Sequence, residues 1–260
     1  VDEAGQYVKG IEDDIPTVQY ERIEHQQKVV EDILEHWVTL SQNGKFHAIL
    51  ATSSIKEAIE YYRLIKAQSD LNITTLFDPN IDNNGAAHDK AAGLLEIVED
   101  YNQKFGQDFT FVTHAKFKKD IAARLGHKKP YAHIAKNPEQ QINLLIVVDQ
   151  MLTGFDSKWL NTLYLDKVIK YENIIQAFSR TNRLFNEIEK PFGTIRYYRK
   201  PHTMEQHINR AVKLYSGDKP IALFVQRLES NLNKLNAIFK EIAELFAHAG
   251  VANFQKLPDD

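Results

Sequence analysis

The segment "INLLIVVDQMLTGFDSKWLNTLYLDK", residues 142–167, holds two apolar runs on either side of a turn with a single glycine. The first run, 142–148, is almost continuously apolar, which is typical of a strand buried on both faces of a parallel sheet. The second run, 161–167, predicts a further strand. Together they indicate an α/β fold built on a parallel sheet.

The flanking sequence extends this sheet in both directions. Further strands are predicted at 46–52, 72–77 and 193–199, and helices at 20–40, 54–68, 87–104, 115–125 and 171–184. Strands that alternate with helices at this spacing imply an open, mainly parallel sheet with helices on both faces. From Met204 onward the pattern becomes helical. An apolar stripe there predicts the start of a helical domain, with Phe224, Leu228, Leu232, Leu235, Ile238, Ile242 and Leu245 as its members.

The bulk composition excludes several classes of protein. The 260-residue chain carries a net charge of −3, so any surface that binds nucleic acid must be local. It contains no cysteine, which excludes disulfides and thiolate metal sites. Its most apolar window, 142–148, is too short to cross a bilayer. Because the chain opens at Val1 without an initiator Met, and residues 1–16 are polar and acidic, we expect a fragment with a loosely held lead-in.

Two polar segments are predicted at the carboxyl ends of strands, where function gathers in open α/β sheets. They are "ATSS" at 51–54 and "DQMLTGFD" at 149–156. In the second segment, Gly154 lets the backbone approach a ligand, and Asp156 can accept a hydrogen bond from a ribose hydroxyl. A simple turn is the alternative explanation.

Arg180 and Arg183 lie in the predicted helix 171–184, with Gln176 one turn before them. Positions i, i+4 and i+7 share one face of a helix. Two adjacent guanidinium groups repel each other unless an anion lies near them, and Arg suits bidentate contact with phosphate. An ordinary solvated face is the alternative, but the arginines and the glycine turn together, in this order, are much less expected by chance.

These two segments carry a family resemblance. "LLIVVDQMLTGFDSKWLNTLYLDK" at 144–167, followed by "NIIQAFSRTNR" at 173–183, resembles motifs V and VI of superfamily 2 helicases. More narrowly, the order and spacing are similar to the motor region of the R (HsdR) subunit of type I restriction enzymes. Residues 46–54 resemble motif IV, and 191–199 resemble the strand after motif VI. The resemblance implies a RecA-like fold, as the second lobe of a two-lobed motor.

The resemblance also implies roles in binding ATP. Arg180 and Arg183 would reach the ATP phosphates, one of them as an arginine finger that stabilises charge in the transition state. Gln176 would couple the state of the nucleotide to lobe closure, and Gly154 and Asp156 would lie near the nucleotide. ATP and Mg²⁺ would be bound mainly by a first lobe that this sequence does not contain.

The implied partners are those of a DNA-translocating restriction enzyme. Thr52, Ser53 and Ser54 would contact the phosphates of duplex DNA, and Thr153 would lie near the DNA backbone. The lobe would work with the first helicase lobe and the nuclease domain of its own subunit, and with methyltransferase and specificity subunits. The implied location is the cytoplasm, with no membrane partner.

Missing motifs limit what this chain can do alone. The sequence has no P-loop of the form G-x-x-x-x-G-K-[ST], and no Glu-x-Lys of a restriction nuclease centre. We therefore expect this chain alone neither to hydrolyse ATP nor to cut DNA. The expected division is a lead-in and linker helix at 1–40, the helicase lobe at 41–200 and the start of a helical domain at 201–260.

Two other functions stay open, as does the role of one basic segment. "LLIVVD" at 144–149 also resembles a Walker B strand, which would make Asp149 the catalytic acid of a self-contained ATPase. The chain could instead be a non-catalytic docking domain. Residues 114–136 carry seven Lys or Arg against one Asp, which suits a track for DNA phosphates and an ordinary basic surface equally well.

Overall fold

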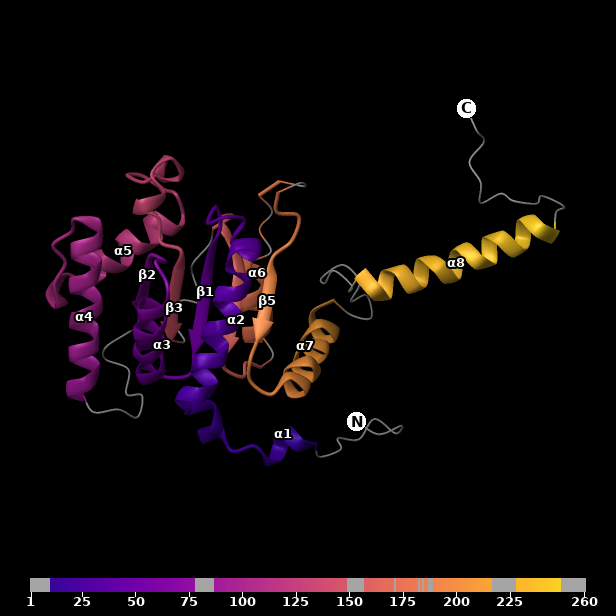
Figure 1. Ribbon diagram of the computed structural model, residues 1–260, viewed down its shortest axis with the longest axis horizontal. Coiled ribbons are helices and arrows are strands. Elements are labelled where there is room, and N and C mark those ends of the chain that lie inside the picture. Colours follow the sequence, from indigo (N-terminus) through magenta and orange to yellow (C-terminus); the bar gives the residue numbers. More distant parts are fainter. Residues whose placement is uncertain are drawn as a thin grey trace. The chain divides into compact units, whose positions relative to one another are not determined.

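Five strands form a single parallel sheet in the described part of the chain, in the order β2-β3-β1-β4-β5 (Figure 1). The computed structural model describes residues 10–77, 87–148, 157–170, 172–181, 183, 185–186, 189–216 and 228–248. The strands are β1 (His47–Thr52), β2 (Ile73–Leu76), β3 (Leu144–Val148), β4 (Leu160–Asp166) and β5 (Thr194–Tyr197). Every neighbouring pair is parallel, which confirms the predicted α/β sheet.

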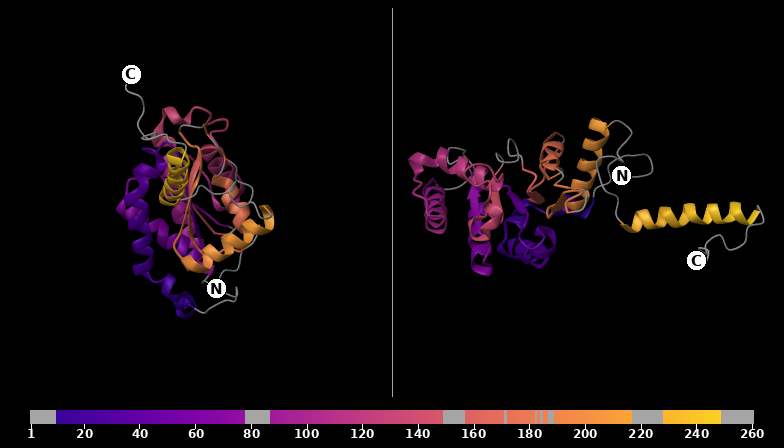
Figure 2. Two further views of the ribbon diagram at one scale, coloured as in Figure 1. Left: turned by 90° about the vertical axis from the view of Figure 1, so that its right-hand side faces the viewer. Right: turned by 90° about the horizontal axis from the view of Figure 1, so that it is seen from above.

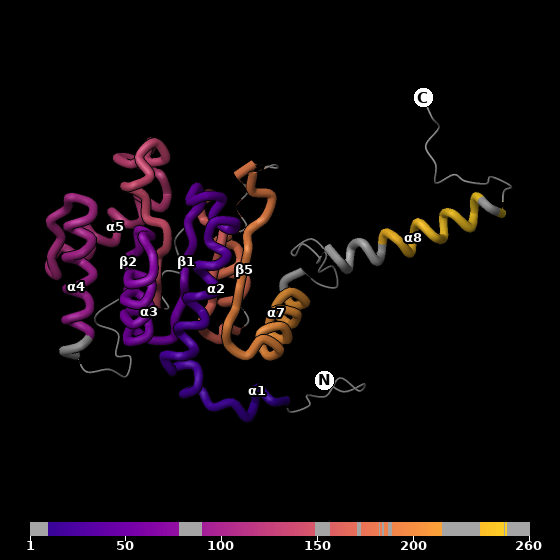
Figure 3. Tube along the Cα trace, in the orientation of Figure 1, coloured from indigo at the N-terminus to yellow at the C-terminus, as the bar shows by residue number. Residues whose placement is uncertain are grey.

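Helices cover both faces of this sheet. The α-helices are α1 (Ile11–Asp14), α2 (Ile23–Ser41), α3 (Ile55–Gln68), α4 (Ala87–Phe105), α5 (His114–Leu125), α6 (Glu172–Thr181), α7 (Pro201–Ser216) and α8 (Leu228–His248). The 3₁₀ helices are η1 (Thr17–Glu21), η2 (Phe111–Thr113), η3 (Ile134–Lys136) and η4 (Pro138–Gln140). With the sheet seen edge-on, α2 and α6 lie on opposite faces (Figure 2). The Cα trace places α4 beside α3, at the β2 side of the sheet (Figure 3).

The core is built from the apolar runs that the sequence displays. Every residue of β1, β3 and β4 is buried, because these three strands lie inside the sheet with helices on both faces. Helix α2 buries one stripe against them, with Val29, Val30, Ile33 and Trp37 at three- and four-residue steps.

In the described part of the amino-terminal segment, Glu12 is buried against the fold, a contact that the prediction of a loosely held lead-in does not anticipate. This residue is 7% exposed. Its carboxylate accepts from the backbone N–H groups of His202 and Thr203, at 2.8 and 2.9 Å, and from the Thr203 hydroxyl at 2.9 Å. A carboxylate satisfies the unpaired N–H groups at a helix N-terminus, so Glu12 ties α1 to the start of α7.

The chain divides into two compact units, residues 1–211 and 212–260. In the second unit, α8 exposes an apolar row formed by Leu235, Ile238, Ile242 and Leu245. None of the described helices is both long enough and apolar enough to cross a membrane.

Candidate functional site

The last residues of β1, β3 and β4 meet at the carboxyl edge of the sheet. Thr52 pairs with Asp166 at the end of β4 and with Val148 at the end of β3. Function in open α/β sheets gathers at this edge. The predicted segment 51–54 lies at this edge, and the predicted segment 149–156 follows β3 in the sequence.

All three hydroxyl groups of the Thr52–Ser54 segment, which is predicted to contact DNA, have partners within the fold. Thr52 is buried, and its hydroxyl lies 3.2 Å from the Ser54 carbonyl oxygen and 3.3 Å from that of Val147, to which it can donate. Ser54 is the N-cap of α3, where its Oγ accepts from the backbone N–H of Glu57 at 3.2 Å. Ser53, between them, is exposed, and its hydroxyl lies 3.4 Å from the Asp166 carbonyl oxygen, to which it can donate. Because Ser53 has the most exposed side chain of the three, it is the best placed of them for a contact with DNA.

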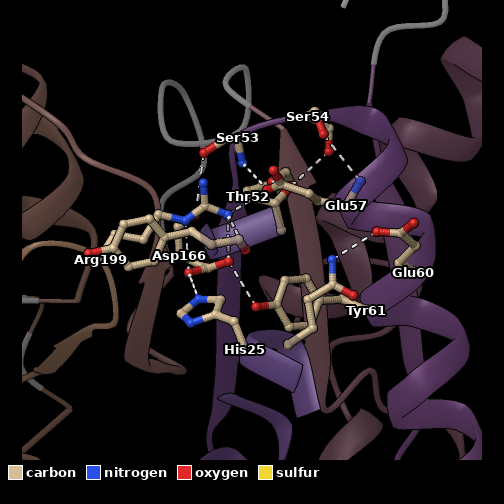
Figure 4. A network of polar contacts seen from close by, with 12 residues as sticks. His25, Thr52, Ser53, Ser54, Glu57, Glu60, Tyr61, Asp166 and Arg199 are labelled. Atoms are coloured by element: carbon tan, nitrogen blue, oxygen red, sulfur yellow. Dashed lines mark hydrogen bonds and ion pairs between the residues drawn. The ribbon is translucent and has the colours of Figure 1, made fainter. Parts of the chain in front are cut away.

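A buried cluster of charged side chains lies at the same edge (Figure 4). The Arg199 guanidinium donates to Asp166 at 3.0 and 2.8 Å and to Glu57 at 2.9 Å. The Tyr61 hydroxyl donates to Oδ2 of Asp166 at 2.8 Å, and Nε2 of His25 lies 2.7 Å from Oδ1. The side chains of Arg199, Glu57 and Asp166 are 4%, 5% and 0% exposed. The cluster thus joins α2, α3 and β4 to the residues that follow β5.

Burial and neighbouring charges set the protonation of this cluster. Burial acts to raise the pKa of Asp166, but hydrogen bonds from His25 and Arg199 outweigh it and hold that pKa below its usual value. At Glu57 burial dominates and raises the pKa of the carboxyl group, despite the nearby Arg199. Burial disfavours the charged form of Arg199, yet Asp166 raises the pKa of the guanidinium. The Asp166–Arg199 pair is therefore ionised, and Glu57 is the carboxylate that takes up a proton more readily.

Sequence reasoning does not single out Asp166, Arg199 or His25. The one available signal is the charged residue that ends each of two mostly apolar strands, in 161–166 and 194–199. Asp166 is 33 positions from Arg199 and 141 positions from His25 along the chain. No local pattern could have paired residues so far apart.

Helix α6 carries Gln176 and Arg180 but ends before Arg183. It spans Glu172–Thr181, so the prediction of a helix to residue 184, with Arg183 on the same face as the other two, is wrong. Gln176 and Arg183 are exposed, and Arg180 is half-buried. All three therefore reach the surface, and two of them are one helical turn apart.

Two contacts accompany the early end of α6. The Thr181 hydroxyl donates to the Phe178 carbonyl oxygen at 3.1 Å, a local bond that competes with the helical pattern. Gly193, directly before β5, lies so close to Thr181 that a Cβ at position 193 would be 2.4 Å from the Thr181 carbonyl oxygen. The chain that leads into β5 therefore passes directly against the last turn of the helix.

Arg180 and the Thr52–Ser54 segment lie toward opposite ends of the strands. The amino edge is where the parallel strands begin, and the carboxyl edge is where they end. Because β4 and β5 are parallel, α6 between them runs back along the sheet, and its last turn lies toward the amino edge. Arg180 is in that last turn, whereas Thr52 ends β1 at the carboxyl edge. The structure thus separates the predicted phosphate contacts of α6 from the predicted DNA contacts.

The predicted residues of the glycine turn lie outside the described part of the chain. They are Thr153, Gly154 and Asp156, together with the alternative catalytic acid Asp149. Their predicted roles stay predictions.

One of the seven basic side chains in the segment 114–136 is buried. Arg124 is 1% exposed and pairs with Asp120, the only acid of the segment, at 2.9 Å. The lysines that remain exposed are Lys116, Lys119, Lys128, Lys129 and Lys136. A DNA track along this segment stays a prediction, and it would rest on these lysines alone.

The described residues suit contact with phosphate better than the binding of a metal ion. Within the described ranges, no group of three or more His, Asp or Glu side chains is arranged to hold a metal. Arg180 and Arg183 offer guanidinium groups, whose planar donors match phosphate oxygens.

Known proteins are similar to this chain in sequence. The family described as "Type I restriction enzyme subunit R domain 3" matches residues 44–200. The endonuclease subunit of type I restriction enzyme SauCOLORF180P from Staphylococcus aureus (strain COL) is 34% identical over 202 residues, which are 72% of this chain and 20% of that protein. The corresponding SsaAORF53P subunit from Staphylococcus saprophyticus is 34% identical over 224 residues, 82% of this chain and 22% of that protein. The chain therefore spans about a fifth of the length of these relatives.

Proposed function

Because this chain belongs to the family of type I restriction enzyme R subunits, in which it corresponds to domain 3, we propose that it is the second motor lobe of an ATP-dependent DNA translocase. In this proposal the lobe does not hold ATP by itself. It completes an ATP site whose larger part, with Mg²⁺, lies on the first helicase lobe of the same subunit. ATP hydrolysis supplies the energy for movement along duplex DNA.

The observation that carries the proposal is the surface placement of Gln176, Arg180 and Arg183 on and after α6 of a parallel α/β lobe. A half-buried arginine can keep a fixed orientation and still reach a neighbouring lobe. Guanidinium groups in such a position can neutralise the charge that develops on a transferring phosphoryl group. Arg180 is the better candidate for the arginine finger, because the helix itself fixes its backbone.

The DNA contacts in this proposal come from the carboxyl edge. Ser53 has the exposed side chain, its backbone N–H donates to the Glu57 carboxylate, and its hydroxyl can donate to the Asp166 carbonyl oxygen. Thr153 would contribute from the neighbouring turn. A translocase must move over any sequence, so contacts with the DNA backbone are more suitable than contacts with base edges. The nuclease domain of the subunit, and the methyltransferase and specificity subunits, would supply cleavage and site recognition.

Two other functions are separated from this one by a single experiment. If Asp149 were the acid of a self-contained ATPase, this chain alone would hydrolyse ATP, and Asp149→Ala would abolish the turnover. If the chain were a docking domain only, the complete subunit would hydrolyse ATP normally without intact arginines at 180 and 183.

We predict no ATP turnover by this chain alone, with or without duplex DNA, because the phosphate-binding loop belongs to the other lobe. The measurement is phosphate release over time, with Asp149→Ala as the matched control. Turnover in the unmodified chain that disappears in the variant would place the catalytic acid here and overturn the half-site proposal. The same assay on an R subunit that contains this chain is expected to show ATP hydrolysis that DNA stimulates.

A further inference from the structure

The position of Arg183 is not set by a helix. Helix α6 ends at Thr181, two residues earlier, so i→i−4 hydrogen bonding does not fix the backbone at position 183. If the Arg183 side chain must reach a particular phosphate oxygen, other contacts must hold its main chain. The structure shows what holds it.

Lys190 donates a hydrogen bond directly to the Arg183 backbone. Its ammonium Nζ lies 2.5 Å from the Arg183 carbonyl oxygen and 3.3 Å from the Lys158 carbonyl oxygen. Lys190 is 1% exposed, and no ion pair joins it to a carboxylate of the described residues. Burial of this ammonium lowers the pKa of Lys190 to about 8. Burying a cation costs free energy unless its donors are satisfied, and here two backbone carbonyl oxygens accept from the ammonium.

Further contacts fix the segment that carries Lys190. The Phe185 backbone N–H donates to the Lys190 carbonyl oxygen at 3.4 Å, and the Lys190 N–H donates to the Asn186 carbonyl oxygen at 3.3 Å. The Phe185 ring packs against Trp159, with ring centroids 4.7 Å apart, and edge-on against Phe46 at 5.5 Å. The ring contacts therefore anchor Phe185 to the starts of β1 and β4, and the Phe185–Lys190 hydrogen bond links this anchor to the residue that carries the ammonium.

Gly193 restricts the movement of the last turn of α6, the helix that precedes Arg183. Its close approach to Thr181 leaves no room for a Cβ, so the last turn of α6 cannot shift toward β5. Arg183 thus follows a helix whose last residue contacts Gly193, and its own carbonyl group accepts from the Lys190 ammonium. A displacement of about 1 Å in such a group can cost about 10²-fold in rate when it acts on the transition state.

We propose that Lys190 is a positioning residue for the ATP site, and that it acts by holding the carbonyl group of Arg183 so that the Arg183 side chain meets the nucleotide phosphates in one orientation. The proposal rests on the motor function proposed above and names a second residue on which that function depends. Lys190 does not touch the nucleotide. Its effect passes through the main chain of Arg183.

A purely structural role for Lys190 makes a different prediction. A residue that only stabilises the lobe would change the amount of folded protein or its melting temperature, and its effect on kcat would add to that of any other change. A positioning residue lowers kcat with little change in KM for ATP, and its effect disappears once the positioned side chain is gone.

The test is a double-mutant cycle in an R subunit that contains this chain, read as DNA-stimulated ATP hydrolysis. Lys190→Met keeps the length of the side chain and removes its donors. We expect kcat to fall by about 10- to 100-fold, with KM for ATP changed by less than about twofold. In an Arg183→Ala background, we expect Lys190→Met to lower kcat by no more than about a further twofold.

Lys104→Met is the matched control. Lys104 is an exposed lysine in the last turn of α4, away from the residues that contact Lys190. We expect this variant to keep normal kcat. If Lys190→Met does not fold, as judged by thermal melting, Lys190→Gln takes its place in the cycle because its amide retains N–H donors on a shorter side chain. A loss of kcat smaller than that of Lys190→Met, but still absent in the Arg183→Ala background, is then expected.

The outcomes separate this inference from the function on which it rests. Normal ATP hydrolysis by Arg183→Ala would count against the role of that arginine in the motor. A large loss in Arg183→Ala, combined with a normal or fully additive Lys190 variant, would leave the motor intact and overturn the positioning role of Lys190.

Discussion

Asp166 is the buried carboxylate to which several elements bond at the carboxyl edge of the sheet. It is completely buried, and side chains from α2, α3 and the segment after β5 all bond to it. A buried carboxylate persists only when its partners satisfy it. Asp166 therefore links α2 to the carboxyl edge of the sheet, where Ser53 is exposed.

We predict that Asp166→Asn destabilises this chain by about 3 kcal/mol, because it leaves Arg199 buried with only Glu57 as a charged partner. The substitution preserves size, so packing changes little. The measurement is the free energy of unfolding in urea at neutral pH. Asp70→Asn, at an exposed position, is the control and is expected to change stability by less than about 0.5 kcal/mol. Equal effects of the two substitutions would contradict this account of the cluster.

The sequence predicts the surroundings of single side chains less well than it predicts helices and strands. Arg124 reads as one of seven surface cations, yet it is buried against Asp120. Thr52 reads as a hydroxyl facing a phosphate, yet its hydroxyl points into the sheet toward the Val147 carbonyl oxygen. Asp120 is one turn away on the same helix, but the other partners of Arg124, Gln140 and Tyr131, lie outside α5. The partner of Thr52 lies on another strand, so only the fold brings these groups near.

The positions of the strands follow the apolar runs of the sequence closely, because buried strands require apolar side chains. The run at 142–148 predicts a strand because burial on both faces requires apolar side chains throughout, and Leu144–Val148 are all buried in β3. The end of α6 is predicted too late because no proline or glycine marks it between Glu172 and Arg183. The helix ends where Gly193 passes Thr181, a contact that the local sequence does not reveal.

Two elements at the amino edge are joined by a pair of histidines. His47 begins β1, and His127 follows α5 with its ring stacked on Trp159, centroids 4.0 Å apart. The Nε2 atoms of the two histidines lie 3.2 Å apart. Burial lowers the pKa of His47 to about 3, assisted by His127, and burial with Lys158 lowers the pKa of His127 to about 4. Both imidazoles are therefore neutral in the folded lobe at neutral pH.

We predict that this pair makes the lobe less stable in mild acid. The unfolded chain binds protons at these histidines below about pH 6.5, whereas the folded chain does not until the pH approaches 4 for His127 and 3 for His47. The stabilisation is thus complete above pH 6.5 and is lost as the pH falls. Each histidine contributes a slope of up to about 1.4 kcal/mol per pH unit. The measurement is the free energy of unfolding between pH 7 and pH 5.

His127→Asn isolates one member of the pair. Residue 127 has φ of 47°, in the left-handed region that Asn tolerates. The variant should lose stability at every pH, since the stacking on Trp159 is gone, but its pH slope should fall by the contribution of one histidine. His133→Asn, at an exposed position, should leave the slope unchanged. An unchanged slope in His127→Asn would show that His127 is protonated in the folded lobe.

At the scale of the whole molecule, this chain corresponds to one segment of much longer relatives. It spans about a fifth of its staphylococcal relatives, and the family match covers residues 44–200. The lobe presents arginines toward one edge of its sheet and an exposed serine at the other. That separation suits a motor in which one lobe must meet a nucleotide and the DNA at different places, and coordinate the two during lobe closure.

A second compact unit begins at residue 212 and contains α8. The exposed apolar row of this helix repeats at three- and four-residue steps. Such a row is typical of a helix that packs against other helices. The proposal that residues 201–260 begin a helical domain is consistent with this pattern, although the first unit extends to residue 211, within α7.

The half-site account is tested most directly by ATP hydrolysis in an R subunit that contains this chain, with Arg180→Ala compared with Arg210→Ala on duplex DNA. Arg210 is an exposed arginine of α7 and serves as the matched control. An arginine finger contributes about 10³- to 10⁵-fold to the rate, so Arg180→Ala should lose DNA-stimulated turnover by orders of magnitude while Arg210→Ala retains it. Near-normal turnover by Arg180→Ala would contradict the claim that this lobe completes the ATP site through that arginine.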